Sequence, residues 1–174
     1  MELNTAMNNR RSIRSYTGES ISKDELDAVL QAAYTAPVGM GKYDGIHLTI
    51  ITNNELLKEI DENGAAFFGN PSLHPLYGAP MLIVISSNDP GNVGSADVGI
   101  ILQNMSLEAV ELGIGHCDIY GATAALTENK ELLKKLNLPD GFTPLGSIIL
   151  GKTKEEYTKR DIPSSHIFSS NRID

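Results

Sequence analysis

Residues 95–112 read Ser-Ala-Asp-Val-Gly-Ile-Ile-Leu-Gln-Asn-Met-Ser-Leu-Glu-Ala-Val-Glu-Leu, and Gly113 follows them. This stretch predicts a long helix that Ser95 caps and Gly113 ends. Its apolar residues occur on every side of the helix. Such a helix must be buried on more than one side, either at the centre of a domain or in an interface between subunits.

Shorter apolar stretches around this helix predict the strands of a sheet. Residues 81–86 are apolar almost without interruption, which is typical of a strand buried on both faces. Further strands are predicted over 46–52, 116–119 and 145–150, and further helices over 3–9, 23–35, 55–63 and 127–137. This order, without internal repeats, predicts one three-layer domain of the α/β or α+β class over residues 1–174, with 151–174 as a polar C-terminal arm.

Several helix starts are marked by capping residues. Ser22 and Glu25 form a capping box before the helix over 23–35. Asn53 or Asn54 can cap the helix over 55–63, and Thr127 the helix that ends near Asn137. Residues 37–45 and 64–80, between these elements, are rich in glycine or proline. Residues 37–45 are predicted to be a flexible loop, and residues 64–80 a loop or a short helix with turns.

Composition and charge exclude several classes of protein. The 174 residues carry a net charge of −8, whereas general nucleic-acid binding needs a basic surface. The apolar runs are too short to span a bilayer, and no signal segment is expected at the N-terminus. Cys117 is the single cysteine, which excludes an internal disulfide and fits the reducing cytoplasm.

Two glycine patterns resemble nucleotide-binding loops. Residues 146–153, Gly-Ser-Ile-Ile-Leu-Gly-Lys-Thr, match the spacing of a phosphate-binding loop. However, Ser-Ile-Ile-Leu favours an extended strand where that loop needs a flexible backbone. Gly39-x-Gly41 follows a helix and precedes a strand, which is the wrong order for a dinucleotide loop.

The triplet His116-Cys117-Asp118 brings together residue types that catalyse nucleophilic reactions. On a strand, neighbouring side chains point to opposite faces, so Cys117 should face away from His116 and Asp118. A buried thiol and an ordinary histidine explain the triplet better than a catalytic group. The four histidines, at 47, 74, 116 and 166, show no metal-ligand spacing, so no metal site is expected.

Positive charge is concentrated near the start of the chain, at Arg10, Arg11, Ser12 and Arg14. In an acidic protein this run indicates an anion site, because guanidinium groups bind phosphate oxygens in pairs. From charge alone, a solvated surface would explain it better. Residues 10–16 resemble the N-terminal signature of the nitroreductase family, and the turn at 36–37, residues 97–104 with 112–115, and residues 117–121 resemble later parts of that family in the same order.

The resemblance implies a nitroreductase-like α+β fold, with a central, mainly antiparallel sheet flanked by helices, in an intertwined homodimer. It implies FMN as cofactor. Arg10 is then expected to bind the phosphate, Arg11 and Ser12 the phosphate or the ribityl hydroxyls, and Arg14 the N1/O2 edge of the ring. Backbone groups of Ile119, Tyr120 and Gly121 are expected near N5, and a second phosphate contact would come from Lys152, Lys159 or Arg160.

The loop after the first long helix departs from the family pattern. Many members have Asn and then Gln-Pro-Trp after the proline turn, whereas residues 37–47 contain no Asn, Gln or Trp. Any ring contact implied for this loop must therefore come from Lys42 or from the backbone of Pro37, Val38, Gly39, Met40 and Gly41.

The resemblance implies an enzyme, an FMN-dependent oxidoreductase that transfers hydride from NADH or NADPH to a small electron-poor acceptor, such as a nitroaromatic or a quinone, by ping-pong turnover. The flavin would carry the chemistry, so no catalytic side chain is nominated. The expected partners are the small acceptor and a second copy of the chain, and neither nucleic acid nor membrane. The missing Asn keeps a non-catalytic flavin or small-ligand binding module as the alternative, and a nucleotide binder using 146–153 is less favoured.

Overall fold

The computed structural model describes residues 1–161, 163 and 168–173. In this part of the chain a single sheet contains four strands: β1 (Ile46–Ile51), β2 (Met81–Ser87), β3 (Gly115–Ile119) and β4 (Thr143–Gly151). Their order is β1-β2-β4-β3, and each neighbouring pair is antiparallel. The predicted antiparallel sheet is therefore confirmed, and β1 and β3 are its edges.

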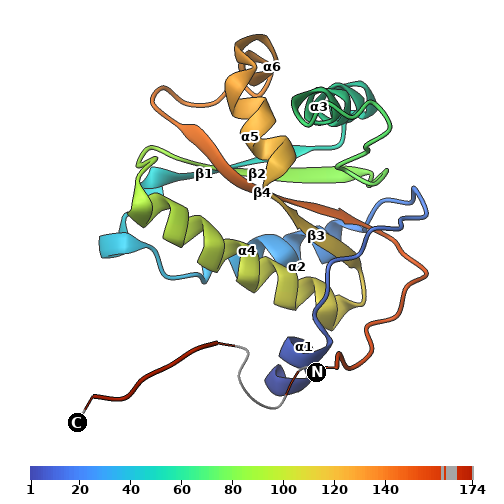
Figure 1. The fold of residues 1–174 in the computed structure, drawn as a ribbon, viewed down its shortest axis with the longest axis vertical. Coiled ribbons are helices and arrows are strands. Elements are labelled where there is room, and N and C mark those ends of the chain that lie inside the picture. The colour runs from blue at the N-terminus through green and yellow to red at the C-terminus, as the bar shows by residue number, and fades with distance from the viewer. Residues whose placement is uncertain (162, 164–167, 174) are drawn as a thin grey trace.

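Helices cover both faces of this sheet and form three layers (Figure 1). The helices α2 (Lys23–Tyr34) and α4 (Asn92–Leu112) lie on one face, and α3 (Asn54–Phe67) and α5 (Gly121–Glu128) lie on the other. The short helix α6 (Lys130–Lys134) follows α5, and α1 (Leu3–Asn9) lies below the sheet near the end of α4. The turns η1 (Gly39–Gly41) and η2 (Tyr43–Gly45) interrupt the predicted loop before β1.

The central strand β2 explains how the two cores are divided. Ile83 and Ile85 are fully buried against α2 and α4, while Leu82 and Val84 are buried against α3 and α5. Successive side chains of a strand point to opposite faces, so a continuous apolar run fills both cores at once. The prediction of a strand buried on both faces is confirmed.

The capping predictions before α2 and α3 are also confirmed. The Ser22 hydroxyl accepts a hydrogen bond from the Glu25 N–H, and the Glu25 carboxylate accepts one from the Ser22 N–H. The Asn53 side chain accepts a hydrogen bond from the Leu56 N–H at 2.8 Å. These contacts satisfy backbone donors that have no partner within the first turn of a helix.

The helix α4 begins at Asn92 after Gly91, so the prediction that Ser95 caps it is wrong. Gly94 fits there because it packs directly on the backbone carbonyl of Asp89, where no side chain would fit. Val98, Ile101 and Met105 are buried, but Val93 and Ile100 on the outer side are 52% and 41% exposed. One chain therefore buries only one side of this apolar helix, and the other side is open.

The helix predicted over 127–137 is wrong in its start and its cap. The chain turns into α5 directly after β3, at Gly121, and α6 is a separate short helix. Its cap is Asn129, which accepts a hydrogen bond from the Leu132 N–H at 3.1 Å. The start of α5 has no side-chain cap, and its alanines are good helix formers that bury one face. The helix α3 also extends to Phe67, beyond the predicted end.

The residues that resemble a phosphate-binding loop form strand β4. Pairs such as Ile148 with Ile83 and with Asp118 show that their backbone is part of the sheet. A Cβ at Gly146 would lie 2.9 Å from Val98 Cγ1 and 3.0 Å from Leu102 Cδ1 on α4. This glycine therefore allows α4 to pack closely on the sheet. A nucleotide site over 146–153 is excluded because the backbone N–H groups are not free to bind phosphate.

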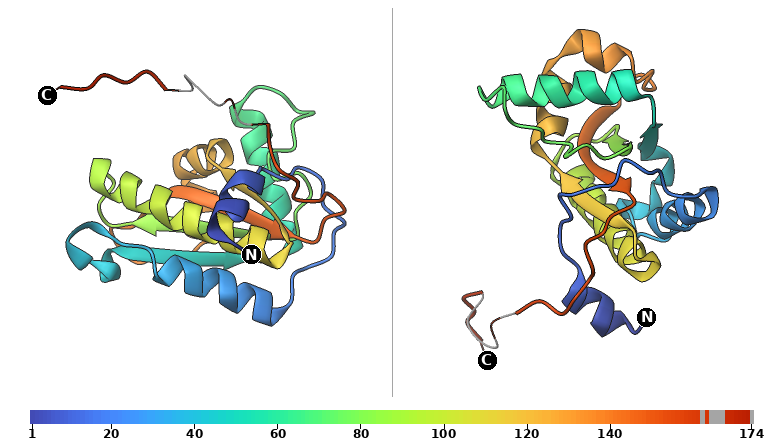
Figure 2. Two further views of the ribbon diagram at one scale, coloured as in Figure 1. Left: turned by 90° about the horizontal axis from the view of Figure 1, so that it is seen from below. Right: turned by 90° about the vertical axis from the view of Figure 1, so that its right-hand side faces the viewer.

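The segment that follows β4 runs back beside α1 without regular secondary structure (Figure 2). The Arg160 N–H donates to the Asn8 carbonyl at 3.1 Å, and the Arg160 side chain donates to the Met7 carbonyl at 3.0 Å. Residues 168–173 then lead away from the body of the molecule. An irregular, polar arm was predicted, and residues 152–160 of it are attached to the N-terminal segment.

Candidate functional site

The arginine-rich segment lies along the free edge of the sheet. The Ile13 N–H donates to the His116 carbonyl of the edge strand β3 at 2.8 Å, and the Ile13 side chain is fully buried. Because neighbouring side chains of an extended chain alternate, fixing Ile13 inward places Ser12 and Arg14 on the other side. The sheet edge therefore holds the predicted cation cluster in place.

The side chains of this segment surround β3. The Ser12 hydroxyl contacts the Cys117 thiol, and the positive charge of Arg14 acts on that thiol too. Burial nevertheless dominates and raises the pKa of Cys117. The charge of Arg10 reaches Asp118, whose carboxylate accepts a hydrogen bond from the Ser106 hydroxyl of α4 at 3.0 Å. Loss of surrounding water raises the pKa of Asp118, and both of these contacts oppose the shift.

The faces of β3 are as the sequence predicts. Cys117 belongs to the core under α5, whereas Asp118 faces α4. His116 is fully buried, and its Nδ1 lies 2.6 Å from the hydroxyl of Tyr157. That hydroxyl donates to the Ile114 carbonyl at 2.8 Å, so Nδ1 of His116 must carry the proton that the tyrosine oxygen accepts. The other nitrogen, Nε2, is buried without a partner among the described residues. The prediction that the triplet is not a catalytic unit agrees with this geometry.

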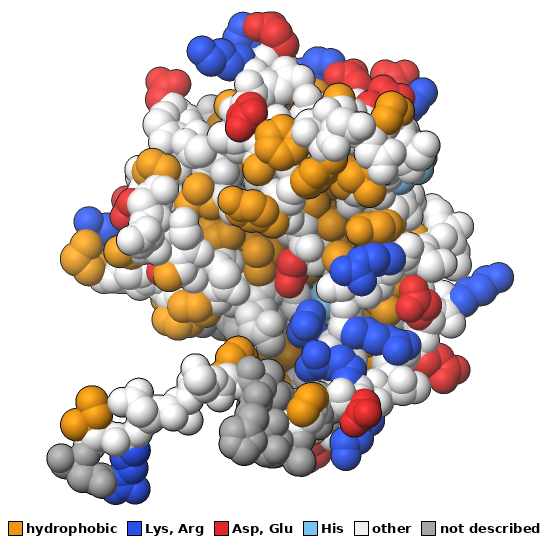
Figure 3. Space-filling view, in the orientation of Figure 1, with side chains coloured by type: hydrophobic (Ala, Val, Ile, Leu, Met, Phe, Trp, Pro, Cys, Tyr) orange, Lys and Arg blue, Asp and Glu red, His pale blue; other side chains and the backbone are white. Residues whose placement is uncertain are grey.

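The cations of the cluster have no compensating carboxylates. None of the ion pairs in the described part of the chain involves Arg10, Arg11 or Arg14. Arg11 donates to the backbone carbonyl of Glu156, and its buried Nε has no partner. Figure 3 shows Lys and Arg side chains gathered on the part of the surface where α1 and β3 lie. In a chain of net charge −8, this concentration of positive charge without carboxylate partners among the described residues makes it the candidate site for an anion.

A groove of about 270 Å³ opens beside this cluster. Arg14 forms part of its wall, and the predicted residues Ile119, Tyr120 and Gly121 form another part. Tyr120 is 77% exposed, and Gly121 lies so close to the Phe68 ring that a Cβ there would be 2.3 Å from Cζ. The structure therefore brings Arg14 together with the predicted backbone segment, at the start of α5. Cys117 and Asp118, from the segment 117–121 that the resemblance singled out, also line the groove. Sequence reasoning missed the remaining lining residues, which are Phe68, Leu73, Pro75, Tyr77 and Ala122.

The second predicted segment, Pro37 to Gly41, does not line this groove and lies in another part of the structure. The Gly39 N–H donates to both carboxylate oxygens of Asp97 near the start of α4, at 2.9 and 3.1 Å. Met40 has a positive φ of 54° and is 85% exposed. Asp97 contacts the segment 37–41, whereas Ser106 contacts β3 beside the groove. These two residues are nine positions apart on α4, which places them about 13 Å apart along the helix axis and on opposite sides of the helix. One chain alone therefore does not bring residues 37–41 to the groove.

The predicted second phosphate contact has other partners. Lys152 pairs with Glu25 at the start of α2, with its Nζ 2.6 Å from Oε1, and this contact lowers the pKa of Glu25. The Arg160 side chain donates hydrogen bonds to the backbone carbonyls of Met7 and Asn8 and so attaches the arm to α1. Lys159 is exposed. Lys152 thus has a carboxylate partner of its own, unlike the arginines of the cluster. The prediction that it binds a phosphate finds no support.

Four other hollows in the described part of the chain are larger than this groove, and no arginine lines any of them. One of about 390 Å³ lies between α2 and β1, and one of about 690 Å³ is lined by Lys58, Asp61 and His74. Lys58 there has a carboxylate partner in Glu62. The smaller groove is therefore the stronger candidate despite its size.

Among the described residues, no cluster of histidine, cysteine or acidic side chains could hold a metal ion, and His166 lies outside those residues. No helix in the described part of the chain has the length and apolar character needed to cross a membrane.

These features define an α+β protein with a basic groove at one edge of an antiparallel sheet, and comparison with known proteins agrees. The family model "Nitroreductase family" matches residues 7–152, so the chain belongs to the nitroreductase family. An FMN reductase (NAD(P)H) of Bacillus subtilis is 27% identical over 177 residues, which cover 91% of this chain and 69% of the relative. A putative NADH dehydrogenase/NAD(P)H nitroreductase of Methanothermobacter thermautotrophicus is 28% identical over 93% of this chain and 83% of its own.

Solved structures show the same fold. A nitroreductase with bound FMN from Bacteroides fragilis superposes with a TM-score of 0.83 at 26% identity, and the match covers 99% of this chain and 100% of the other. A nitroreductase with bound FMN from Desulfitobacterium hafniense superposes with a TM-score of 0.85 at 24% identity, over 99% of both chains. The predicted family and fold are confirmed.

Proposed function

We propose that this chain is an FMN-dependent oxidoreductase that takes a hydride from NADH or NADPH and reduces a small electron-poor acceptor, such as a nitroaromatic or a quinone. Donor and acceptor would use the same groove in turn. The observation that carries the proposal is the cluster of Arg10, Arg11 and Arg14, which has no carboxylate partner among the described residues and lies beside the groove lined by residues 117–122. The relatives named above, including an FMN reductase, support it.

The residues present fit FMN. Its phosphate carries close to two negative charges, and the unpaired guanidinium groups of Arg10 and Arg11 match this charge and offer several donors each. The buried Nε of Arg11 is a donor that still needs an acceptor. Ser12 offers a hydroxyl beside them, and Arg14 offers a cation within the groove for the polar edge of the ring. The bound cofactor supplies the redox chemistry by accepting and returning an electron pair.

The protein would mainly bind and orient the reactants. Residues 119–121 line the groove at the point where β3 becomes α5, and the absence of a side chain at Gly121 lets a flat ring approach the backbone. Tyr120 is exposed at the rim, where it can contact a donor or acceptor. We nominate no side chain in the described part of the chain as a general acid or base. Since Cys117 is single and free, we also propose a cytoplasmic location.

We further propose that two copies of the chain form the complete site. The open side of α4 presents a stripe at helical spacing, which consists of the apolar residues Val93, Ala96, Ile100 and Leu107 and the polar Gln103. If two copies of α4 pack antiparallel about a twofold axis, the start of one helix lies near the end of the other. This arrangement would carry Pro37, Val38, Gly39, Met40 and Gly41 of one copy toward the groove of its partner.

The visible absorption spectrum of the purified protein tests the proposal. We expect flavin bands, either as isolated or after incubation with FMN, that NADH or NADPH bleaches without oxygen and that a nitroaromatic or a quinone restores. Bands that neither nucleotide bleaches would favour the non-catalytic binding module instead. No flavin binding at all would refute the proposal.

A paired substitution locates the cofactor. Arg10→Ala with Arg14→Ala should raise the Kd for FMN about tenfold or more, since each removes a charge-assisted contact. Lys130→Ala with Lys154→Ala removes the same charge from exposed positions and should change the Kd less than twofold. If the two double variants changed the Kd for FMN equally, the arginine cluster would not be part of the binding site.

A further inference from the structure

Tyr77, at the wall of the groove, has an unusual backbone. Its φ is 51°, and Gly78 follows with φ of 71°. The left-handed region costs energy for a residue with a Cβ, and glycine or asparagine occupies it more easily. Such strain persists only where the surrounding contacts impose it, and it concentrates at functional sites.

The Tyr77 ring contacts the cation of the proposed site. The Cζ atom of Arg14 lies 5.7 Å from the centre of the ring, within the range of a cation–π contact. Among the effects that raise the pKa of Arg14, the contact of its guanidinium group with the Tyr77 side chain is the largest. Both residues line the same groove, and Arg14 has no ion pair in the described part of the chain. The ring is therefore placed to determine where this guanidinium points.

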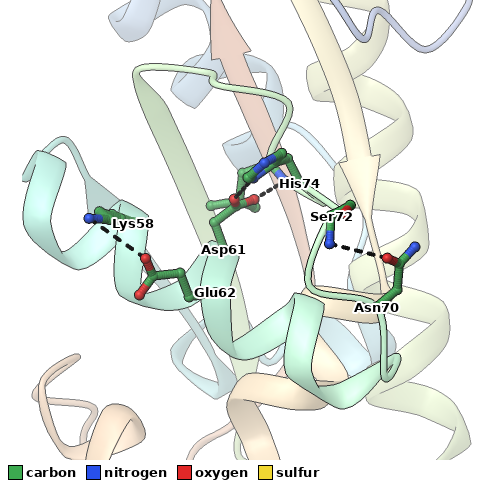
Figure 4. A network of polar contacts seen from close by, with 7 residues as sticks. Lys58, Asp61, Glu62, Asn70, Ser72 and His74 are labelled. Atoms are coloured by element: carbon green, nitrogen blue, oxygen red, sulfur yellow. Dashed lines mark hydrogen bonds and ion pairs between the residues drawn. The ribbon is translucent and has the colours of Figure 1, made fainter.

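The helix α3 fixes the residues before Tyr77. One carboxylate oxygen of Asp61 accepts a hydrogen bond from the Leu76 N–H at 2.8 Å, and the other lies 2.8 Å from Nδ1 of His74 (Figure 4). The Leu76 side chain is 2% exposed and belongs to the core under α3 and α5. The Tyr77 N–H donates to the His74 carbonyl at 2.9 Å, which closes a turn. Asp61 thus clamps the segment that holds Tyr77 in its strained conformation.

We propose that Tyr77 is the positioning residue of Arg14, and that Asp61 locks Tyr77 in place. This inference rests on the proposed function, since Arg14 is assigned there to the polar edge of the flavin ring. It adds a specific role for the segment after α3, to which sequence reasoning had assigned only a loop or a short helix with turns. The role is indirect, because Tyr77 acts by orienting the guanidinium group.

A double-mutant cycle distinguishes positioning from ordinary packing. Apo-protein is titrated with FMN and with riboflavin, which lacks the phosphate, and the Kd is measured from flavin fluorescence. Tyr77→Leu should raise both Kd values by a similar factor of about five, the size of one exposed cation–π contact, because Arg14 acts at the ring and not at the phosphate. In the Arg14→Ala background, the same substitution should change either Kd less than twofold.

Matched variants complete the test. Tyr77→Phe keeps the ring and should stay within about threefold of the unmutated chain, whereas Tyr34→Leu, at an exposed tyrosine of α2, should have no effect. Asp61→Ala should act in the same direction as Tyr77→Leu, and Asp61→Asn, which retains an acceptor for the Leu76 N–H, should act less. Thermal unfolding of each apo-variant identifies any that fails to fold, and Tyr77→Phe and Asp61→Asn keep the fold intact for the comparison.

The outcomes separate this inference from the proposed function. If the unmutated chain binds FMN but Tyr77→Leu is without effect, or has the same effect with and without Arg14, the positioning role is overturned and the proposed function stands. A loss for FMN with none for riboflavin would also overturn it, because it would place Arg14 at the phosphate. If the unmutated chain binds neither flavin, both proposals fail together.

Discussion

The Gly39 N–H donates to both carboxylate oxygens of Asp97, at 2.9 and 3.1 Å, and so ties the glycine-containing turn to the first part of α4. A Cβ at Gly39 would lie 2.6 Å from Val93 Cγ1, which shows how closely the turn lies on the helix. This turn contains the residues that we propose a second copy of the chain contributes to the site. In the proposed dimer, its attachment would therefore link the groove to the helix at the interface.

Removing the Asp97 carboxylate should loosen this turn. We expect Asp97→Ala to lower the free energy of unfolding by about 1.5 kcal/mol, because a backbone donor loses a charged acceptor. Hydrogen exchange at the Gly39 amide should become faster at the same time. Asp97→Asn keeps one acceptor oxygen and should lose less than half as much. Unchanged exchange at Gly39 in Asp97→Ala would mean that the turn is held by packing alone.

The close approach of Gly121 and Phe68 predicts a change in binding without a large change in folding. In Gly121→Ala, the new Cβ would meet the Phe68 ring, but that ring is 51% exposed and can move. Alanine also favours the helix that starts there by up to about 1 kcal/mol. We therefore expect unfolding by urea to stay within about 1 kcal/mol of the unmutated chain, while the Kd for FMN rises several-fold.

A second variant shows which atom causes the loss. If the new Cβ itself blocks the ring of the cofactor, Gly121→Ala with Phe68→Ala should bind FMN as weakly as Gly121→Ala. Recovery of binding in the double variant would show that the displaced phenyl ring was responsible. Unchanged binding in Gly121→Ala would remove this glycine from the site.

The buried imidazole of His116 predicts how stability depends on pH. Burial first, and then the charge of Arg10, lowers the pKa of His116 from 6.5 to about 3. Below pH 6.5 the unfolded chain therefore binds a proton that the folded chain does not, so stability falls as the pH falls from 6.5 toward 3. The slope is about 1.4 kcal/mol per pH unit for one proton.

Urea unfolding between pH 6.5 and 5 measures this effect, above the range in which most carboxylates titrate. In His116→Phe, the slope of the free energy of unfolding against pH between these two pH values should be smaller by about the contribution of one proton. His47→Phe and His74→Phe are the comparison variants, and neither should remove this slope: His47 is half-buried with its ring edge-on against Phe142, and His74 is exposed and pairs with Asp61. Equal slopes in the unmutated chain and in His116→Phe would contradict the prediction.

The sequence predicted those features that depend on local patterns. The continuous apolar run of β2 and the capping box at Ser22 and Glu25 are local patterns, and each is found in the structure. The positive charge concentrated in residues 10–14 is also local and is read directly from the sequence. The start of α5 at Gly121 could not be predicted in this way, because no capping side chain marks it and packing against the sheet determines it.

The same limit applies to the candidate site. Residues 10–14 and 119–121 were predicted to act together, and the groove places Arg14 beside 119–121. Tyr77 was missed because the role that we propose for it depends on Asp61 of α3, and the only local signal was a tyrosine followed by glycine in a turn. Lys152 was predicted as a phosphate contact from its place after the last strand, and its pairing with Glu25 was not foreseen because the two residues are far apart in the sequence.

The contact between Gly146 and α4 limits how this protein can evolve. With Val98 and Leu102 pressed against that position, any enlargement there would wedge the longest helix away from the strands beneath it. Substitutions at these three sites must therefore be tolerated as a set, with a gain in volume at one offset by a loss at another. Two parts of the chain that are distant in sequence are thus expected to change together. A designer who alters the outer surface of α4 should leave the residues that face Gly146 unchanged.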